Sequence, residues 1–129
     1  MNPNPINYRL HPELYTSNQD DEAALYVEPY AREVVQYWRF GTMEEAAESA
    51  ALLYECYMRY KESGEFVGMD VVRRLLHLGL KRAREQGGKP SASSAGPLRP
   101  GPAQIFSKTY HMVNNDPDYM ALRGEYLRG

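Results

Sequence analysis

The hydrophobic pattern of the chain is strongest between Phe66 and Gln86, where apolar residues recur at helical spacing. At about 100° per residue these apolar residues fill one broad side of a helix, and basic residues occupy an arc of about 100° on the other side. We therefore predict a helix that turns one side to the core and the other to water or an anion. The apolar side comprises Val71, Val72, Leu75, Leu76, Leu78, Gly79, Leu80 and Ala83, and the basic side comprises Arg73, Arg74, His77, Lys81 and Arg84.

A second long helix is predicted upstream, over residues 42–62. Thr42 and Glu45 have the spacing of a capping box, and Gly64 follows the alanine-rich run as a helix stop. Because the connection is short, residues 42–62 and 68–86 are expected to form an antiparallel hairpin. A glycine inside the second helix, Gly79, costs roughly 1 kcal/mol relative to alanine, and a close helix crossing would explain its presence.

The flanking segments divide the chain into four parts. Residues 1–28 contain several prolines and are predicted to form an extended strap across the helical body. Residues 29–86 form the helical core, which starts with a short helix. Residues 87–101 are rich in glycine, proline and serine and are predicted to be a flexible linker or loop. Residues 102–129 provide C-terminal helices that pack on the core. The prediction is one all-α domain, a compact bundle of four to five helices around the hairpin.

Charge is distributed unevenly along the 129 residues. The formal net charge is only −2, but residues 1–72 carry 5 Lys and Arg against 13 Asp and Glu, whereas residues 73–129 carry 10 against 4. Two interpretations follow from this asymmetry. Either the two halves neutralise each other within the molecule, or the second half presents a basic surface to a phosphate-bearing partner.

Cysteine content and hydropathy set the compartment that we expect. Cys56 is the only cysteine, which excludes an intramolecular disulfide and a zinc site built from several cysteines. The N-terminus lacks the apolar run of a secretory signal, and no stretch of about 18 apolar residues is present to span a bilayer. We therefore expect a cytoplasmic protein without a membrane partner.

Residues typical of catalysis are few. His11, His77 and His111 lie far apart in the sequence and do not have the spacing of metal ligands. Cys56 has no histidine near it in the sequence to activate it. The chain also lacks a Walker-type loop and the GxGxxG and GxSxG motifs. We predict no catalytic residue, metal or cofactor. A small enzyme with a His–carboxylate site assembled from distant residues stays an alternative.

Five short words of the sequence occur together in a known family. They are HPELY near the start, EPY, YWRF at Tyr37–Phe40, FVGMD at Phe66–Asp70 and RAR at Arg82–Arg84. In these words the chain resembles a family of small cytoplasmic bacterial, fungal and phage proteins known as a domain of unknown function. The resemblance covers about residues 12–86 and, through QIF and DYMAL, parts of the C-terminal region. It implies a shared fold and family-typical positions but no reaction.

The basic side of the Phe66–Gln86 helix is the first candidate binding surface. Arginine offers forked donors to phosphate oxygens, and lysine offers a point charge. The leading hypothesis is therefore a non-enzymatic binding or adaptor module whose Arg73, Arg74, His77, Lys81 and Arg84 engage an acidic partner, such as nucleic acid or an acidic protein. The opposing interpretation is that acidic residues of the upstream helix neutralise this side, for example Glu48, Glu55 and Glu62.

The aromatic residues around Trp38 are the second candidate. Tyr30, Tyr37 and Trp38 lie close in sequence to Arg39, an arrangement that can stack on bases or cations or form a protein–protein contact. The same pattern is typical of a core in which tyrosine hydroxyls reach the surface. A protein–protein interaction module predicts an exposed apolar patch here, whereas a core predicts burial of all three rings.

Overall fold

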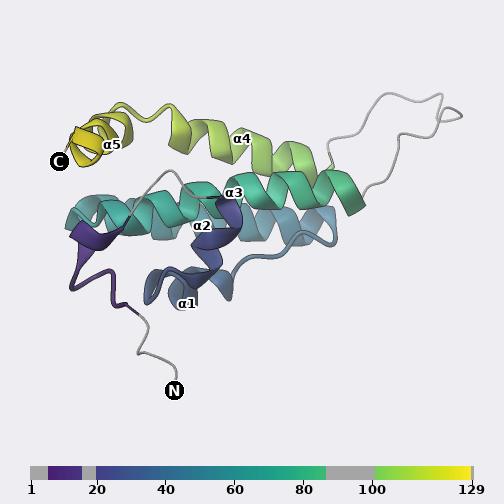
Figure 1. Cartoon of the computed structure of the whole chain (residues 1–129). Coiled ribbons are helices and arrows are strands. Elements are labelled where there is room, and N and C mark those ends of the chain that lie inside the picture. The colour runs from purple at the N-terminus through teal and green to yellow at the C-terminus, as the bar shows by residue number, and fades with distance from the viewer. Residues whose placement is uncertain (1–5, 16–19, 87–100, 129) are drawn as a thin grey trace, which may run out of the picture.

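The computed structural model shows an all-α protein and describes residues 6–15, 20–86 and 101–128. Within these ranges every regular element is a helix, which confirms the predicted fold class, a compact helical bundle (Figure 1). Two short 3-10 helices precede the α-helices. In chain order the elements are η1 (Pro12–Leu14), η2 (Asp21–Tyr26), α1 (Tyr30–Val35), α2 (Met43–Ser63), α3 (Phe66–Gln86), α4 (Pro102–Asn114) and α5 (Pro117–Arg128).

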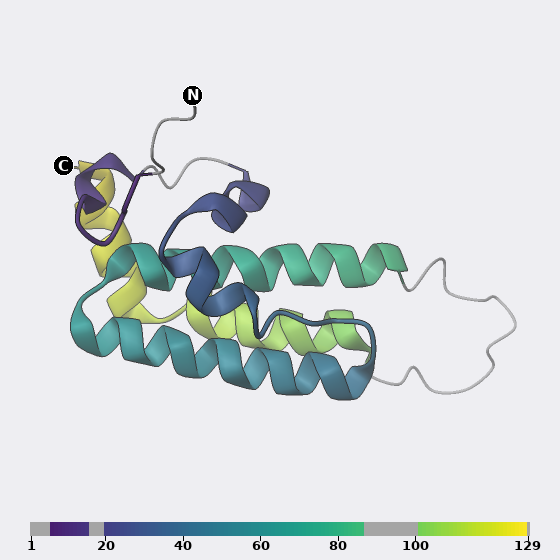
Figure 2. The same cartoon turned by 90° about the horizontal axis from the view of Figure 1, so that it is seen from below.

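Helices α2 and α3 form the predicted antiparallel hairpin (Figure 2). At the start of α2 the Thr42 hydroxyl accepts a hydrogen bond from the Glu45 amide at 3.1 Å, and the Glu45 carboxylate accepts one from the Thr42 amide at 3.1 Å. The capping box is therefore present. Gly64 follows α2 with a φ of 73°, a left-handed conformation that glycine adopts without a steric cost.

The core lies where α4 packs along both helices of the hairpin (Figures 1 and 2). Leu75 and Leu76 of α3 and Phe106 of α4 are completely buried there. A Cβ atom on Gly79 would lie 2.9 Å from Nε1 of Trp38 and 3.3 Å from the Phe106 ring. Because such distances are too short for a Cβ contact, glycine is what lets α4 and Trp38 approach α3 so closely.

The N-terminal region lies against the hairpin. Within the predicted strap over 1–28, the described residues include η1 and η2, so the strap is not uniformly extended. Pro12 occupies the first turn of η1, where its fixed φ suits a helix start. Helix η2 packs on α3. The predicted linker over 87–101 falls outside the described residues, except for Gly101.

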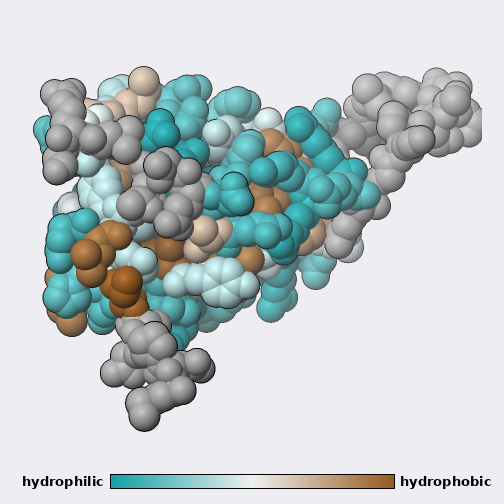
Figure 3. Space-filling model, viewed as in Figure 1, coloured by the Kyte–Doolittle hydropathy of each residue, from teal (hydrophilic) through white to brown (hydrophobic). Residues whose placement is uncertain are grey.

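The surface of the bundle is mainly polar. In the view of Figure 3, hydrophilic residues cover most of the molecule over α3, and small apolar areas interrupt them toward the N-terminal end. Exposed apolar side chains in the N-terminal segment are Ile6, Leu10 and Leu14. None of the helices in the described ranges combines the length and the apolar composition needed to cross a bilayer.

Candidate functional site

Two arginines of the predicted basic side belong to a buried charged cluster at the N-terminal end of α3. The carboxylate of Asp70 is inaccessible to solvent, and it lies 3.0 Å from Nε of Arg73 and 3.2 Å from Nε of Arg74. The Arg74 side chain is only 1% exposed and that of Arg73 only 11%. The two guanidinium groups are therefore turned toward a carboxylate of their own helix, and the prediction that they face outward is wrong.

Two tyrosines from the ends of the chain complete this cluster. The hydroxyl of Tyr15 donates to Oδ2 of Asp70, and that of Tyr119 in α5 donates to Oδ1. The Tyr119 ring lies 5.7 Å from the Arg73 guanidinium, and the Tyr15 ring lies 5.5 Å from that of Arg74. We call Tyr15, Asp70, Arg73, Arg74 and Tyr119 the Asp70 cluster. Its members come from α3, α5 and the N-terminal segment, and the helical pattern of α3 alone does not reveal the two tyrosines.

Burial and the nearby charges shift the pKa values of three members of the cluster, Tyr15, Tyr119 and Arg73. Burial raises the pKa of both Tyr15 and Tyr119, and the nearby Asp70 carboxylate raises it further, so both hydroxyls stay protonated donors. Burial alone would lower the pKa of Arg73, but attraction to Asp70 outweighs it and the pKa is raised overall. The cluster is thus a buried ion pair in which the Asp70 carboxylate accepts hydrogen bonds from Tyr15, Tyr119 and Arg73.

The next two residues of the predicted basic side pair with η2. Nδ1 of His77 lies 2.5 Å from Oδ2 of Asp21, and Nζ of Lys81 lies 3.2 Å from the same oxygen. Burial raises the pKa of Asp21, but hydrogen bonds from His77 and Lys81 outweigh this effect and the pKa falls below its usual value. The His77 side chain is half-buried and packs on the Tyr110 ring at 4.8 Å.

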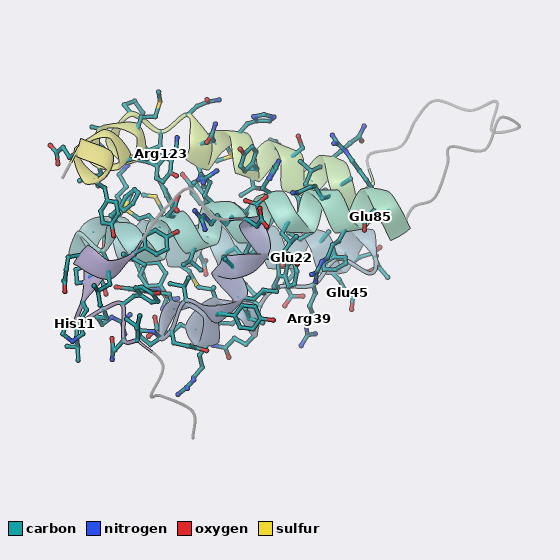
Figure 4. All side chains as sticks on the ribbon, viewed as in Figure 1. His11, Glu22, Arg39, Glu45, Glu85 and Arg123 are labelled. Carbon is teal, nitrogen blue, oxygen red and sulfur yellow. The ribbon has the colours of Figure 1, made fainter. Side chains whose placement is uncertain are left out.

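The C-terminal end of α3 is the most exposed part of the basic side. Arg82 lies 3.6 Å from Glu22 of η2, whose position beside α3 is labelled in Figure 4. Its guanidinium also lies 5.2 Å from the Trp38 ring. Arg84 is exposed, and among the residues that the structure describes no carboxylate lies within 4 Å of it. Of the five predicted basic residues, Arg84 alone has no ion pair in this part of the chain.

The acidic residues that neutralise this side differ from those expected. Asp21, Glu22 and Asp70 provide the neutralising carboxylates. The alternatives suggested from the sequence, Glu48, Glu55 and Glu62, are exposed on α2 and form no ion pair with any described residue. The physical reason is that η2 and the N-terminal segment, rather than α2, cover the polar side of α3.

The structure separates the predicted aromatic cluster into parts. Tyr30 belongs to the core, where its hydroxyl donates to Glu65 at 2.9 Å and its ring meets Tyr60 edge-on. Trp38 is half-buried and donates from Nε1 to the Leu75 carbonyl at 2.9 Å. Tyr37 is half-buried and Arg39 is exposed. These two residues therefore remain at the surface, next to α2.

Tyr37 and Arg39 line a groove between the segment after α1 and the outer side of α2. A hollow of about 580 Å³ is mostly apolar, and a neighbouring hollow of about 320 Å³ shares Tyr37 and Leu52 with it, so the two adjoin at these residues. Figure 4 shows Arg39 and Glu45 close together at the N-terminal end of α2. We call this surface the aromatic groove; its lining residues are Gln36, Tyr37, Arg39, Glu45, Glu48, Ser49, Leu52, Tyr54, Glu55, Met58 and Arg59.

The sequence did not identify most of this groove. Leu52 and Met58 are each turned by about 100–140° from the buried Leu53 and Tyr57 on α2, so the helical period places them away from the side that faces the core. The signal in the sequence that could have identified the groove was an apolar residue on the solvent side of a predicted helix. The sequence does not show, however, that Tyr37 would pack next to them and turn an apolar stripe into a hollow.

Other residues considered for chemistry lie apart from one another. The hollow nearest to the His77–Asp21 pair, of about 330 Å³, is lined by charged side chains on η2 and α3 but not by His77. Cys56 is buried, with Nη2 of Arg59 3.2 Å from its Sγ. His11 and His111 are exposed. Within the described ranges no three His, Cys, Asp or Glu residues are grouped as metal ligands.

Comparison with protein families identifies a family that matches this chain. A family model described as a domain of unknown function, DUF4385, matches residues 1–128. The chain belongs to the DUF4385 family. This match covers the region of the resemblance, residues 12–86 and the words QIF and DYMAL, and includes both parts of the chain that supply tyrosines to the Asp70 cluster of this DUF4385 protein. Comparisons with curated proteins and with solved structures give no match.

Replacing Asp70 tests the buried cluster of the DUF4385 protein. Asp70→Asn should lower the free energy of unfolding by about 3–5 kcal/mol, because it leaves two buried guanidinium groups without their carboxylate. Tyr119→Phe removes one charge-assisted hydrogen bond and should cost about 1.5–3 kcal/mol. Urea denaturation followed by circular dichroism measures both. Tyr110→Phe, which removes a hydroxyl without a bond to any described residue, is the control. A cost below about 0.5 kcal/mol for Tyr119→Phe would contradict the assignment.

Acid should weaken the contact between η2 and α3. The pKa of Asp21 in the folded protein lies below its ordinary value of 3.8, so its stabilising effect is complete above pH 3.8 and is lost as the pH falls below that value. Asp21→Asn should therefore be less stable than the unmodified protein at neutral pH, and the two unfolding free energies should converge in acid. Urea denaturation over a pH series measures the difference. A gap that stays constant down to the acid end would disprove this role.

Proposed function

We propose that the protein is a non-enzymatic protein-binding module that docks a segment of a partner protein in the aromatic groove. The observation that supports this most is the mainly apolar lining that Tyr37, Leu52, Tyr54 and Met58 contribute to the larger hollow. Met58 is exposed and the other three are half-buried, two of them, Tyr37 and Tyr54, at the edge of the core. Apolar surface in contact with water costs about 25 cal/mol per Å², a cost that a docked segment removes.

The composition of the groove is that of an interface. Tyrosine and methionine are enriched at the centre of protein–protein contacts, where large or adaptable apolar side chains exclude water. Charged side chains, among them Arg39, Glu48 and Glu55, stand around the apolar lining and supply the polar rim that such contacts have. Neither histidine nor cysteine lines the groove, so the residues favour binding over acid–base or nucleophilic chemistry.

Selection from a phage-displayed peptide library tests this function. Immobilised protein should enrich peptides that share apolar anchor residues, because the groove offers an apolar lining. Met58→Gln should weaken binding of the selected peptides by about tenfold or more, equivalent to about 1.4 kcal/mol of lost apolar contact. Met120→Gln on α5 is the matched control, since it makes the same exchange at another exposed methionine. Failure to enrich any peptide, or equal loss with both variants, would rule out the groove as the docking site.

A second candidate function uses the remaining basic surface. Arg84 on α3 and Lys108 on α4 are exposed, and within the described part of the chain neither has a carboxylate within 4 Å. Together with Lys81, these groups support weak binding of an acidic partner, nucleic acid included. Helices α3 and α4, which carry these cations, pack side by side.

Titration with a labelled oligonucleotide distinguishes this candidate. If the basic surface binds nucleic acid, fluorescence anisotropy should report binding at low ionic strength that weakens steeply with added salt. The double variant Arg84→Gln/Lys108→Gln should weaken it several-fold and reduce the salt dependence. Arg32→Gln removes an exposed cation from α1 and serves as the control. Absence of binding at low ionic strength would exclude the nucleic-acid version of this candidate.

A further inference from the structure

The outer side of α2 carries a line of acidic residues along the aromatic groove. Glu44, Glu48, Glu55 and Glu62 follow one another at intervals of four and seven residues, which places them within an arc of about 40° on a helix. All four are exposed. Two of them also line the groove: Glu55 borders its larger hollow and Glu48 its smaller one.

These four carboxylates form no ion pair with a described residue, as is also true of some other acidic residues such as Glu85 and Glu125. Most of the other carboxylates packed between elements have an intramolecular partner; Glu33 and Glu65 bind Arg9, and Asp116 binds Lys61. Among the described residues no lysine, arginine or histidine lies within 4 Å of the four glutamates on α2. Lys61, the basic residue in the last turn of α2, contacts Asp116 and Asp118 instead.

The arrangement is unfavourable for α2 by itself. Glu44 and Glu48 are like charges four residues apart, a spacing that destabilises an isolated helix. Glu62 lies in the last turn, where the negative end of the helix dipole disfavours a carboxylate. A cationic partner lying along α2 would reduce the repulsion between Glu44 and Glu48. The groove combines an apolar lining with Glu48 and Glu55 at its edge, which form no ion pair within the described part of the chain, although Arg39 and Arg59 also line it.

We infer that the segment docked in the aromatic groove is a basic amphipathic helix of a partner protein. This inference rests on the proposed function and adds the chemistry of the partner. The groove follows α2 from Glu45 to Arg59, a span of about 21 Å at the rise of an α-helix. A helix of about 14 residues matches that length. Its apolar side packs on Tyr37, Leu52 and Met58, and lysine or arginine residues beside that stripe reach Glu48 and Glu55.

Three synthetic peptides test the charge of the partner. They share one helical sequence with the same apolar stripe, and their flanking positions are all lysine, all glutamine or all glutamate. The probe is fluorescence anisotropy of each labelled peptide with the full chain, at low and at physiological ionic strength. The lysine peptide should bind about tenfold more tightly than the glutamine peptide, this advantage should shrink with salt, and the glutamate peptide should not bind.

Variants of the protein test which of its residues recognise the charge of the peptide. Glu48→Gln/Glu55→Gln should weaken the lysine peptide about three- to tenfold and leave the glutamine peptide unchanged, because only the former pairs with these carboxylates. Glu85→Gln removes an exposed carboxylate at the end of α3, as labelled in Figure 4, and should change neither affinity. Met58→Gln should weaken both peptides, since both use the apolar lining.

The outcomes separate this inference from the function on which it rests. Equal affinity of the lysine and glutamine peptides, both weakened by Met58→Gln, would overturn the basic partner and leave the groove as a docking site. Binding of the lysine peptide that Met58→Gln does not change would overturn both, because charge alone would then drive it. If none of the three peptides binds, the helical partner is excluded. The peptide-library selection then determines whether the groove is a docking site.

Discussion

The fold depends on one buried carboxylate, that of Asp70. An ionised group out of contact with water is tolerated only when charges and hydrogen bonds compensate it, since the effective penalty is several kcal/mol for each ion. Arg73 and Arg74 supply the opposite charge from the same helix. The hydrogen bonds come from Tyr15 and Tyr119, which lie 55 and 49 residues away in the sequence. The carboxylate is therefore satisfied only when both ends of the chain are docked on α3, so it couples their packing to the core.

The same coupling explains the uneven charge of the chain. The acidic first half and the basic second half meet in the folded protein, where Asp21 binds Lys81 and Asp70 binds Arg73. Of the two interpretations of the asymmetry, intramolecular neutralisation describes most of the basic side of α3. Among the described residues, the charges that these pairs leave without an ion partner include the exposed glutamates of α2 and the exposed Arg84 and Lys108.

Local features of the fold were predictable from the sequence, and contacts between distant segments were not. The capping box at Thr42 and the stop at Gly64 act within a few residues, so the bounds of α2 follow from composition and spacing alone. The direction of Arg74 on α3 also follows from periodicity, but its surroundings depend on Tyr15. Because Arg74 lies on the polar side of α3, it was predicted to face outward, although the N-terminal segment covers it.

The candidate groove was also only partly predictable from the sequence. Leu52 and Met58 lie on the solvent side of α2 as periodicity requires, and the aromatic pattern around Trp38 drew attention to Tyr37. Their meeting in one hollow depends on how the segment after α1 crosses α2. Trp38 determines this crossing, because its indole is fixed between the Leu75 carbonyl and the Arg82 guanidinium. Tyr37 precedes Trp38 and lines the aromatic groove together with residues of α2. The same short segment thus contributes one aromatic residue that packs on α3 and one that lines the candidate groove.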